Sequence, residues 1–400
     1  MENENNSKRK NTTNTINDFH DDILTHIISF LPIKDAFRTT LLSKRWVLLC
    51  RSLPVLHIND DGVKNEKDLI QFRQMLDAVM FSPRSQDSTH KSFKLTCCSI
   101  LWDANVDCFN MDKWIEAATG LRVEYLYLHL FENPLTLTIF CCKTLVVLHL
   151  TDIHVPNMFD CSLHLPLLKI LYLFSVRFQD SVDFTKLLYG CPKLDCLSTL
   201  FVEPAVTTFE ANAGITAEGY FNPLSNLISA VVDVPYKAVS NVKFLSVFGI
   251  LDTEEINSYN NGFPVFGNLI ELQLCWIHGI HDYVEVVKML QNCPKLQALR
   301  IEKVCLSHQR YALSTTIENW EYPDHVPKCV SSHLTTCRIE LYEAMEADFR
   351  FASYILKNAR LLQVMTICRT LTPKPIESPK NLEDLSSCPK ISPTCKLELI

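Results

Sequence analysis

The chain has 400 residues, a formal net charge of −7 and 47% apolar residues, which supply enough side chains for a large folded core. Because the net charge is negative and no stripe of lysine or arginine is apparent, we expect no nucleic-acid partner. The apolar runs are far shorter than the ~20 residues that a membrane span requires, so we also expect no membrane partner.

The number and spacing of the glycines and cysteines exclude several further kinds of site. Only 9 residues are glycine, and none has the spacing of a dinucleotide-binding loop. The 17 cysteines are odd in number, include no Cys-x-x-Cys pair and follow no signal-peptide-like segment. We therefore expect a protein of the cytoplasm or nucleus with reduced thiols, no metal and no cofactor. No Gly-x-Ser-x-Gly or His-Glu-x-x-His motif occurs, so we predict a non-catalytic protein.

Residues 1–17 are rich in Asn, Thr and Lys and are interpreted as a disordered tail. Apolar residues at helical spacing then predict a first helix that ends before Pro32, because proline disfavours helix at the preceding residue. Two further short helices are predicted over residues 33–42 and 44–49. A unit this small cannot bury all of its large apolar side chains, so an exposed stripe is available for the rest of the chain or for a partner.

The segment from Asp18 to Trp46 closely resembles the F-box in its plant form. The resemblance rests on the Phe-Leu-Pro block ending at Pro32 and on the Leu-Ser-Lys-Arg-Trp block ending at Trp46. It implies a three-helix unit that binds the Skp-type adaptor of a cullin-RING ubiquitin ligase. The residues it implies for adaptor binding are Phe19, His20, Ile23, Leu24, Ile27, Leu31, Pro32 and Trp46.

The chain departs from the family at one point, since Phe19-His20 stands where Leu-Pro is usual. Two hypotheses therefore stay open. In the first, the F-box binds the adaptor and the chain is the substrate-recognition subunit of an SCF-type (Skp–cullin–F-box) ligase. In the second, a degenerate F-box no longer binds the adaptor, and the chain is a non-catalytic interaction scaffold.

The middle of the chain repeats a Leu-x-x-Leu-x-Leu template. Most copies are 22 to 28 residues apart, which is typical of leucine-rich repeats that stack short strands and helices into a solenoid. One gap of 48 residues is long enough to hide a degenerate copy. The second template position falls at Leu126, Leu148, Leu171, Leu197, Leu245, Leu272, Leu299, Cys337 and Met365.

Side chains alternate along a strand, so the residue after each second template position faces away from the core. These residues are aromatic or imidazole in the early copies and polar or charged in the later ones. We interpret them as a surface that binds an unidentified protein substrate. The candidate substrate-binding residues are Tyr127, His149, Tyr172, Gln273, Arg300 and Arg338.

The C-terminal part resembles the FBD domain, which accompanies F-boxes and leucine-rich repeats in many plant proteins. The resemblance rests on the segments from Trp320 to Val330, from Tyr354 to Thr366 and from Cys388 to Cys395.

The predicted fold is α/β: an N-terminal three-helix F-box, a leucine-rich-repeat solenoid and an FBD-like C-terminal cap. The expected organisation is a tail (1–17), an F-box (18–58), a transition into the solenoid (59–115), leucine-rich repeats (116–310) and an FBD-like module (311–400).

Overall fold

The computed structural model describes residues 15–81, 91–98, 104–131, 135–158, 162–179, 181–203, 223–233, 237–248, 264–276, 283–303, 323–342, 346–369 and 384–400. The chain divides into two compact units, Met1–Tyr127 and Leu128–Ile400. Most of the predicted tail, residues 1–14, lies outside the described residues. Among the described helices, none is both long and apolar enough to cross a membrane.

The first unit begins with the three predicted helices, α1 (Asp21–Ser29), α2 (Ile33–Arg38) and α3 (Lys44–Arg51). Pro32 is the N-cap residue of α2, a place where its missing N–H costs no helical hydrogen bond. The second helix is shorter than expected, because the chain tightens into a 3-10 turn over Thr39–Leu41. The buried side chains of this small core are Leu24, Ile28, Ala36, Trp46, Leu49, Cys50 and Leu53.

The region we interpreted as a transition (59–115) contains regular elements of its own: α4 (Glu66–Met80), β2 (Ser92–Thr96) and most of α5 (Ala104–Gly120). Strand β1 (Val55–Asn59) ends where this region begins. Strand β3 (Tyr125–His129), whose last two residues belong to the second unit, comes after it. Strand β1 pairs in parallel with β2, and its burial alternates residue by residue. Asn65 caps α4 by accepting a 3.1 Å hydrogen bond from the backbone N–H of Asp68. These elements extend the strand–helix pattern toward the N-terminus.

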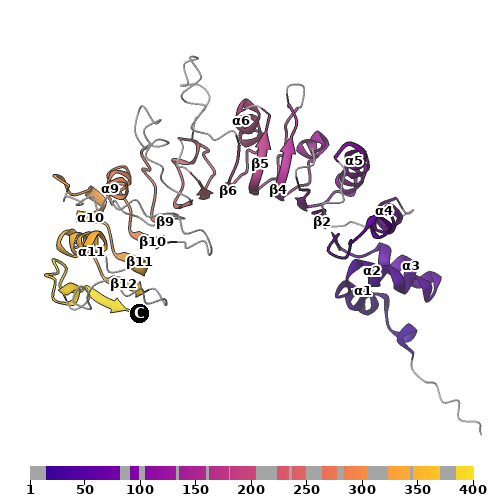
Figure 1. Cartoon of the computed structure of the whole chain (residues 1–400), viewed down its shortest axis with the longest axis horizontal. Coiled ribbons are helices and arrows are strands. Elements are labelled where there is room, and N and C mark those ends of the chain that lie inside the picture. Colours follow the sequence, from indigo (N-terminus) through magenta and orange to yellow (C-terminus); the bar gives the residue numbers. More distant parts are fainter. Residues whose placement is uncertain are drawn as a thin grey trace, which may run out of the picture. The chain divides into compact units, whose positions relative to one another are not determined.

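The second unit carries a sheet of short parallel strands paired in chain order, with helices along one of its faces (Figure 1). Its strands are β4 (Val147–Val155), β5 (Ile170–Phe178), β6 (Cys196–Leu200), β7 (Ser229–Val232), β8 (Phe244–Phe248), β9 (Glu271–Trp276), β10 (Ala298–Lys303), β11 (Thr336–Tyr342), β12 (Val364–Arg369) and β13 (Lys396–Leu399). Its helices are α6 (Ser181–Tyr189), α9 (Val284–Gln291), α10 (Lys328–Ser332) and α11 (Glu346–Asn358). The expected α/β architecture is confirmed.

The template positions of the second unit lie opposite one another across the sheet, so they form one stacked row of side chains, all buried except the partly buried Leu397 at its end. This stacking covers apolar surface that a single repeat would leave exposed. The core row consists of Leu148, Leu171, Leu197, Ala230, Leu245, Leu272, Leu299, Cys337, Met365 and Leu397.

The gap of 48 residues between Leu197 and Leu245 does contain another copy of the repeat. Strand β7 pairs with β6 on one side and with β8 on the other, and Ala230 occupies the template position. Its sequence, Ser-Ala-Val-Val, has no leucine, which explains why the template did not detect it.

The sequence Cys-Pro-Lys-Leu occurs at Cys191 and again at Cys293, each time at a corner where a helix turns into the next strand. Cys191 follows α6, and its buried thiol donates to the carbonyl oxygen of Leu187 at 3.1 Å. Cys293 follows α9 and donates to the carbonyl oxygen of Met289 at 3.2 Å. The thiols thus bond carbonyls in the last turn of each helix; that of Met289 also accepts from the backbone N–H of Asn292 at 3.0 Å. A small apolar side chain with a weak donor fits these corners.

Candidate functional site

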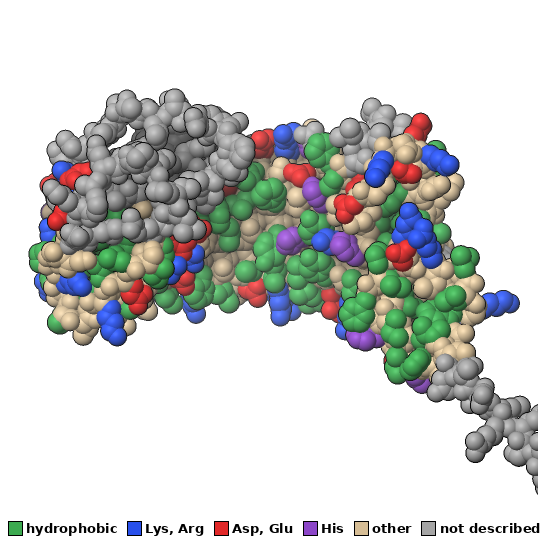
Figure 2. All heavy atoms as spheres, turned by 60° about the horizontal axis from the view of Figure 1, so that its bottom comes forward, with side chains coloured by type: hydrophobic (Ala, Val, Ile, Leu, Met, Phe, Trp, Pro, Cys, Tyr) green, Lys and Arg blue, Asp and Glu red, His purple; other side chains and the backbone are tan. Residues whose placement is uncertain are grey.

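Large apolar side chains remain exposed around the small core of α1, α2 and α3. Leu41 is 86% exposed and Phe30 74% exposed, although both belong to a unit whose core is closed. Figure 2 shows hydrophobic side chains gathered over this helical part of the chain. We name this set the helical patch; its members are Phe19, Ile23, Ile27, Phe30, Leu31, Leu41, Leu42 and Leu48.

The residues that the F-box resemblance implies for adaptor binding fall into two groups. Phe19, Ile23, Ile27 and Leu31 lie in the helical patch, and His20 and Pro32 are exposed beside it. The other two are not on the surface: Leu24 is fully buried, and Trp46 is 2% exposed. They shape the core under the patch, so any part they have in adaptor binding is indirect.

The segment that lacks the usual Leu-Pro is held in place by contacts with α3. The guanidinium of Arg45 donates to the carbonyl oxygens of Asn17 and Phe19 and lies 2.6 Å from a carboxylate oxygen of Asp21. The indole N–H of Trp46 donates to the side-chain oxygen of Asn17 at 2.7 Å. These contacts join residues 24 to 29 positions apart in the chain. They fix the backbone on both sides of Phe19, a role that a rigid proline would otherwise fill.

One row of side chains runs across the face of the second unit's sheet opposite the core row. Five of the six candidate substrate-binding residues lie in it, in register: His149, Tyr172, Gln273, Arg300 and Arg338. The sixth, Tyr127, lies in the first unit, where the ammonium of Lys94 sits 4.5 Å from its ring centre. The complete central row is His149, Tyr172, Ser198, Val231, Ser246, Gln273, Arg300, Arg338, Thr366 and Glu398.

The part of this face over β4–β6 is aromatic. The rings of His149 and Tyr172 lie 4.0 Å apart between centres, and those of Phe174 and Phe201 lie 5.4 Å apart, edge to face. Phe174 and Phe201 are about half exposed and were not among our candidates. Figure 2 shows hydrophobic side chains with histidines among them in the middle of the view. We name Tyr172, Phe174 and Phe201 the aromatic surface.

A break in the alternation puts Phe201 on this surface. Asp152, Ser175 and Phe201 have φ angles of 50°, 53° and 56°, a left-handed conformation that non-glycine residues rarely adopt. Asp152 and Ser175 occupy matching places in β4 and β5, where the register between the strands omits one residue in each. An extra residue of this kind re-aims the side chains that follow it. Strict in–out alternation along a strand therefore predicts that Phe174, two residues after Tyr172, lies on the outward face, but it does not predict this for Phe201.

The part of the face over β9–β11 is ionic, and its charges compensate one another. Arg300 lies 2.6 Å from a carboxylate oxygen of Glu340, and Arg338 lies 2.7 Å from the same oxygen. Gln273 donates to Glu302 at 3.0 Å. This network leaves little net charge, so it favours recognition by hydrogen bonds over long-range attraction.

Two observations on the described residues concern metal binding and thiol chemistry. They contain no group of three or more His, Cys, Asp or Glu side chains able to hold a metal ion. Burial raises the pKa of Cys191 to about 12, and burial together with Glu302 raises that of Cys275 to about 12. Such thiols stay protonated near neutral pH and are poor nucleophiles.

Three families match separate parts of the chain. The F-box domain matches residues 16–58, the leucine-rich repeats of FBD-associated F-box protein At5g56370 match residues 111–210, and the FBD domain matches residues 321–367. The chain belongs to the F-box/FBD/LRR-repeat protein family. The resemblance drawn from the sequence is thus confirmed, with all three parts in the expected order.

Relatives of this F-box/FBD/LRR-repeat protein in Arabidopsis thaliana align along nearly their whole length. F-box/FBD/LRR-repeat protein At5g56420 is 27% identical over 425 residues, covering 94% of this chain and 96% of the relative. F-box/FBD/LRR-repeat protein At4g26340 is 26% identical, covering 96% of this chain and 99% of the relative.

The matched ranges correspond to parts of the structure. The F-box range includes α1, α2 and α3 and ends inside β1, and the repeat range includes β3 to β6. The FBD range includes α10, β11, α11 and most of β12. Of the residues that suggested the FBD domain, Trp320 lies outside the described residues, and the segment from Cys388 to Cys395 lies beyond the matched range.

Proposed function

We propose that this F-box/FBD/LRR-repeat protein is the substrate-recognition subunit of an SCF-type ubiquitin ligase in the cytoplasm or nucleus. Its three-helix unit binds a Skp-type adaptor, and the central row of the second unit binds the protein to be ubiquitinated. Tyr127 of the first unit is a separate candidate for target binding. The thioester chemistry belongs to the partners, because the receptor contributes binding and positioning. The observation that carries the proposal is the helical patch, which stays exposed around a closed core in the range that matches the F-box.

The helical patch has the size that a stable contact needs. Each fully buried leucine, isoleucine or phenylalanine side chain contributes about 1.5–3 kcal/mol. Eight such side chains belong to the patch, and several of them together offset an association cost of roughly 4–15 kcal/mol. Leu41, Phe30 and Leu48 are its most exposed members, and we expect them to carry most of the adaptor affinity.

The competing function is a scaffold whose F-box no longer binds the adaptor. The substitution of Phe19-His20 for Leu-Pro favours it, because the proline and a close apolar contact are lost. The contacts of Arg45 with the carbonyl oxygens of Asn17 and Phe19 favour the receptor, since they order the same segment by other means.

A binding assay with purified plant Skp-type adaptor separates the two functions. If the chain is a receptor, the wild-type protein is captured at micromolar concentration, and Phe19→Leu/His20→Pro improves affinity only a fewfold. If it is a scaffold, the wild-type protein is not captured and the double variant restores capture. Absence of binding by both proteins would contradict adaptor binding altogether.

Target binding is tested separately. Proximity labelling in plant cells, with a version that lacks residues 18–54, identifies proteins that bind without being degraded. A triple variant, Tyr127→Ala/Tyr172→Ala/Arg300→Ala, is then expected to lose most of these proteins. If it retains all of them, the target site lies elsewhere on the chain.

A further inference from the structure

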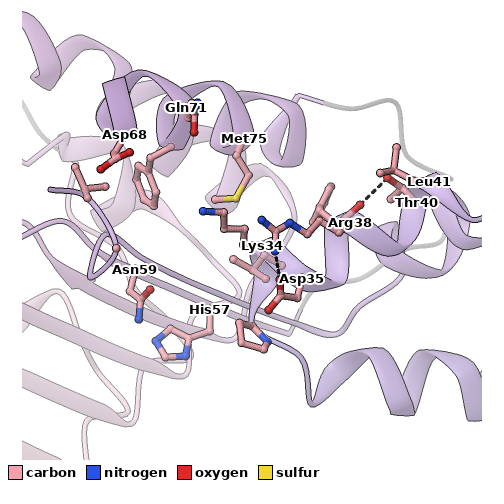
Figure 3. A pocket seen from close by; sticks show the side chains of 16 residues that line it. Lys34, Asp35, Arg38, Thr40, Leu41, His57, Asn59, Asp68, Gln71 and Met75 are labelled. Carbon is pink, nitrogen blue, oxygen red and sulfur yellow. Dashed lines mark hydrogen bonds and ion pairs between the residues drawn. The ribbon is translucent and has the colours of Figure 1, made fainter. Parts of the chain in front are cut away.

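A cavity of about 700 Å³ lies in the first unit between α2, β1 and α4 (Figure 3). This volume falls within the ~300–1,000 Å³ of sites that bind small molecules or short peptide segments. We name it the α2–α4 pocket; the lining residues that matter here are Lys34, Arg38, His57, Asn59, Phe72 and Met75. None of these six is a candidate adaptor-binding or substrate-binding residue, but Pro32, a candidate for adaptor binding, and Leu41 of the helical patch line the outer edge of the pocket.

Some charges in the α2–α4 pocket are already compensated. Arg38 lies 2.8 Å from a carboxylate oxygen of Asp35. One carboxylate oxygen of Asp68 accepts hydrogen bonds from the backbone N–H of Lys64 at 3.2 Å and from the side chain of Asn65 at 2.9 Å. These two donors are neutral, so Asp68 keeps its negative charge at one edge of the pocket, and Lys34 carries the positive charge that is left to attract an acidic ligand.

The ammonium of Lys34 extends into the middle of the pocket, between Met75 on one side and His57 and Asn59 on the other (Figure 3). Lys34 has no carboxylate partner within the part of the chain that the structure describes. Burial and the nearby charge of Lys94 both lower the pKa of His57, so its imidazole is neutral at pH 7 and can share a hydrogen bond with a ligand.

The inner wall of the pocket is apolar. Phe72 is 9% exposed, and Met75 is partly buried beside it on α4. A ligand that fits the pocket therefore needs an apolar group for this wall and a negative group for Lys34.

The pocket continues onto the strands of the first unit. His57 stands directly opposite Lys94 in the β1–β2 pairing, and Lys94 in turn covers the ring of Tyr127. An extended peptide chain that enters the pocket can continue along these three side chains. A small acid held inside the pocket would not use them.

We infer that the α2–α4 pocket binds a short segment of the target protein that carries an apolar side chain next to an acidic one. The carboxylate pairs with Lys34, and the apolar side chain packs on Phe72 and Met75. The inference rests on the proposed function, because it states the class of target segment that this receptor selects.

Fluorescence anisotropy with the full chain tests the inference. The probes are three labelled peptides, Gly-Ser-Leu-Glu-Phe-Ser-Gly and its analogues with Gln or Lys in place of Glu. We expect the Glu peptide to bind at least fivefold more tightly than the Gln peptide and the Lys peptide to bind most weakly. The preference for Glu should decrease as salt is added.

Two variants and one control locate the site. Lys34→Gln should remove the preference for Glu over Gln. Met75→Trp should fill the cavity and lower the affinity for all three peptides about tenfold. The matched control is Lys67→Gln, because Lys67 is an exposed lysine on α4 that does not line the pocket. This variant should keep the wild-type affinity for each of the three peptides.

Equal binding of the three peptides, no binding of any, or the same effect from Lys34→Gln and Lys67→Gln would overturn the inference. Displacement of the Glu peptide by excess acetate alone would also overturn it, since the pocket would then hold small acids. An adaptor titration on the same preparations separates the two claims. Lost adaptor binding with an intact Glu preference contradicts the proposed function, and the reverse contradicts only the pocket.

Discussion

The three-helix part of the first unit and the stacked strands of the second unit bury their leucines to very different extents. Leu41 in the helical patch is 86% exposed, whereas Leu272 in the core row is fully buried between neighbouring repeats. A core of about 40 residues is too small to bury all of its large apolar side chains, so some stay on the surface. In a repeat array, each added repeat buries the apolar side chains of the repeat before it. Under the proposed function, this difference corresponds to two kinds of binding: apolar area for the adaptor, and specific aromatic and polar groups for the target.

The largest expected difference between the two regions is in stability. Leu272→Ala should lower the free energy of unfolding by about 2–5 kcal/mol, because it leaves a cavity in the core row. Leu41→Ala should change it by less than ~0.5 kcal/mol, since the side chain is already in water. Urea unfolding of the full chain measures both. Equal losses would mean that Leu41 is buried in the folded protein and would contradict an exposed helical patch.

The buried thiols at the helix corners of the second unit predict a loss of stability in alkali. Burial raises the pKa of Cys191 from its ordinary value of 9.0 to about 12. Between these pH values the unfolded chain loses the proton and the folded chain keeps it, so stability falls as pH rises. The expected fall is about 1.4 kcal/mol per pH unit for this thiol.

Cys191→Ala should therefore show a shallower fall between pH 9 and 12 than the wild-type protein, with thermal unfolding as the measurement. The matched control is Cys141→Ala, whose thiol is exposed and should leave the slope unchanged. Identical slopes in all three proteins would contradict a protonated corner thiol.

A small stability effect is expected at the ionic network of the second unit. Arg300→Gln leaves Glu340 paired with Arg338 at 2.7 Å, so the free energy of unfolding should fall by less than ~1 kcal/mol. The loss should shrink further at high salt. Chemical unfolding at low and high ionic strength checks this. A loss of several kcal/mol would show that the network supports the fold rather than an accessible surface.

The template predicted every member of the core row except Ala230 and Leu397, because an apolar side chain, most often leucine, is needed to fill the stack. It missed β7, whose core position holds the small Ala230. It also missed β1 and β2, because the long helix α4 places the paired residues Leu56 and Phe93 farther apart than the 22 to 28 residues between most copies. Spacing finds repeats only where their helices are of similar length.

The candidate surfaces were predictable to different degrees. Alternation along the strands placed Tyr172 and Arg300 correctly on the outward face. It could not predict that Phe201 lies on this face, because the position of that side chain depends on a left-handed backbone conformation that no simple sequence pattern indicates. Nor could it predict the contacts of Arg45 with Asn17 and Phe19, because they join separate segments through backbone carbonyls.

Calorimetric titration of the full chain with a purified plant Skp-type adaptor tests the central claim most directly. The account predicts micromolar or tighter binding with a negative heat-capacity change, the signature of apolar burial. Leu41→Glu/Leu48→Glu should weaken binding at least 100-fold, while Ile70→Glu, an exposed residue on α4 outside the helical patch, should stay within twofold of wild type. Undetectable binding of the wild-type chain, or equal affinity in all three proteins, would contradict adaptor docking through the helical patch.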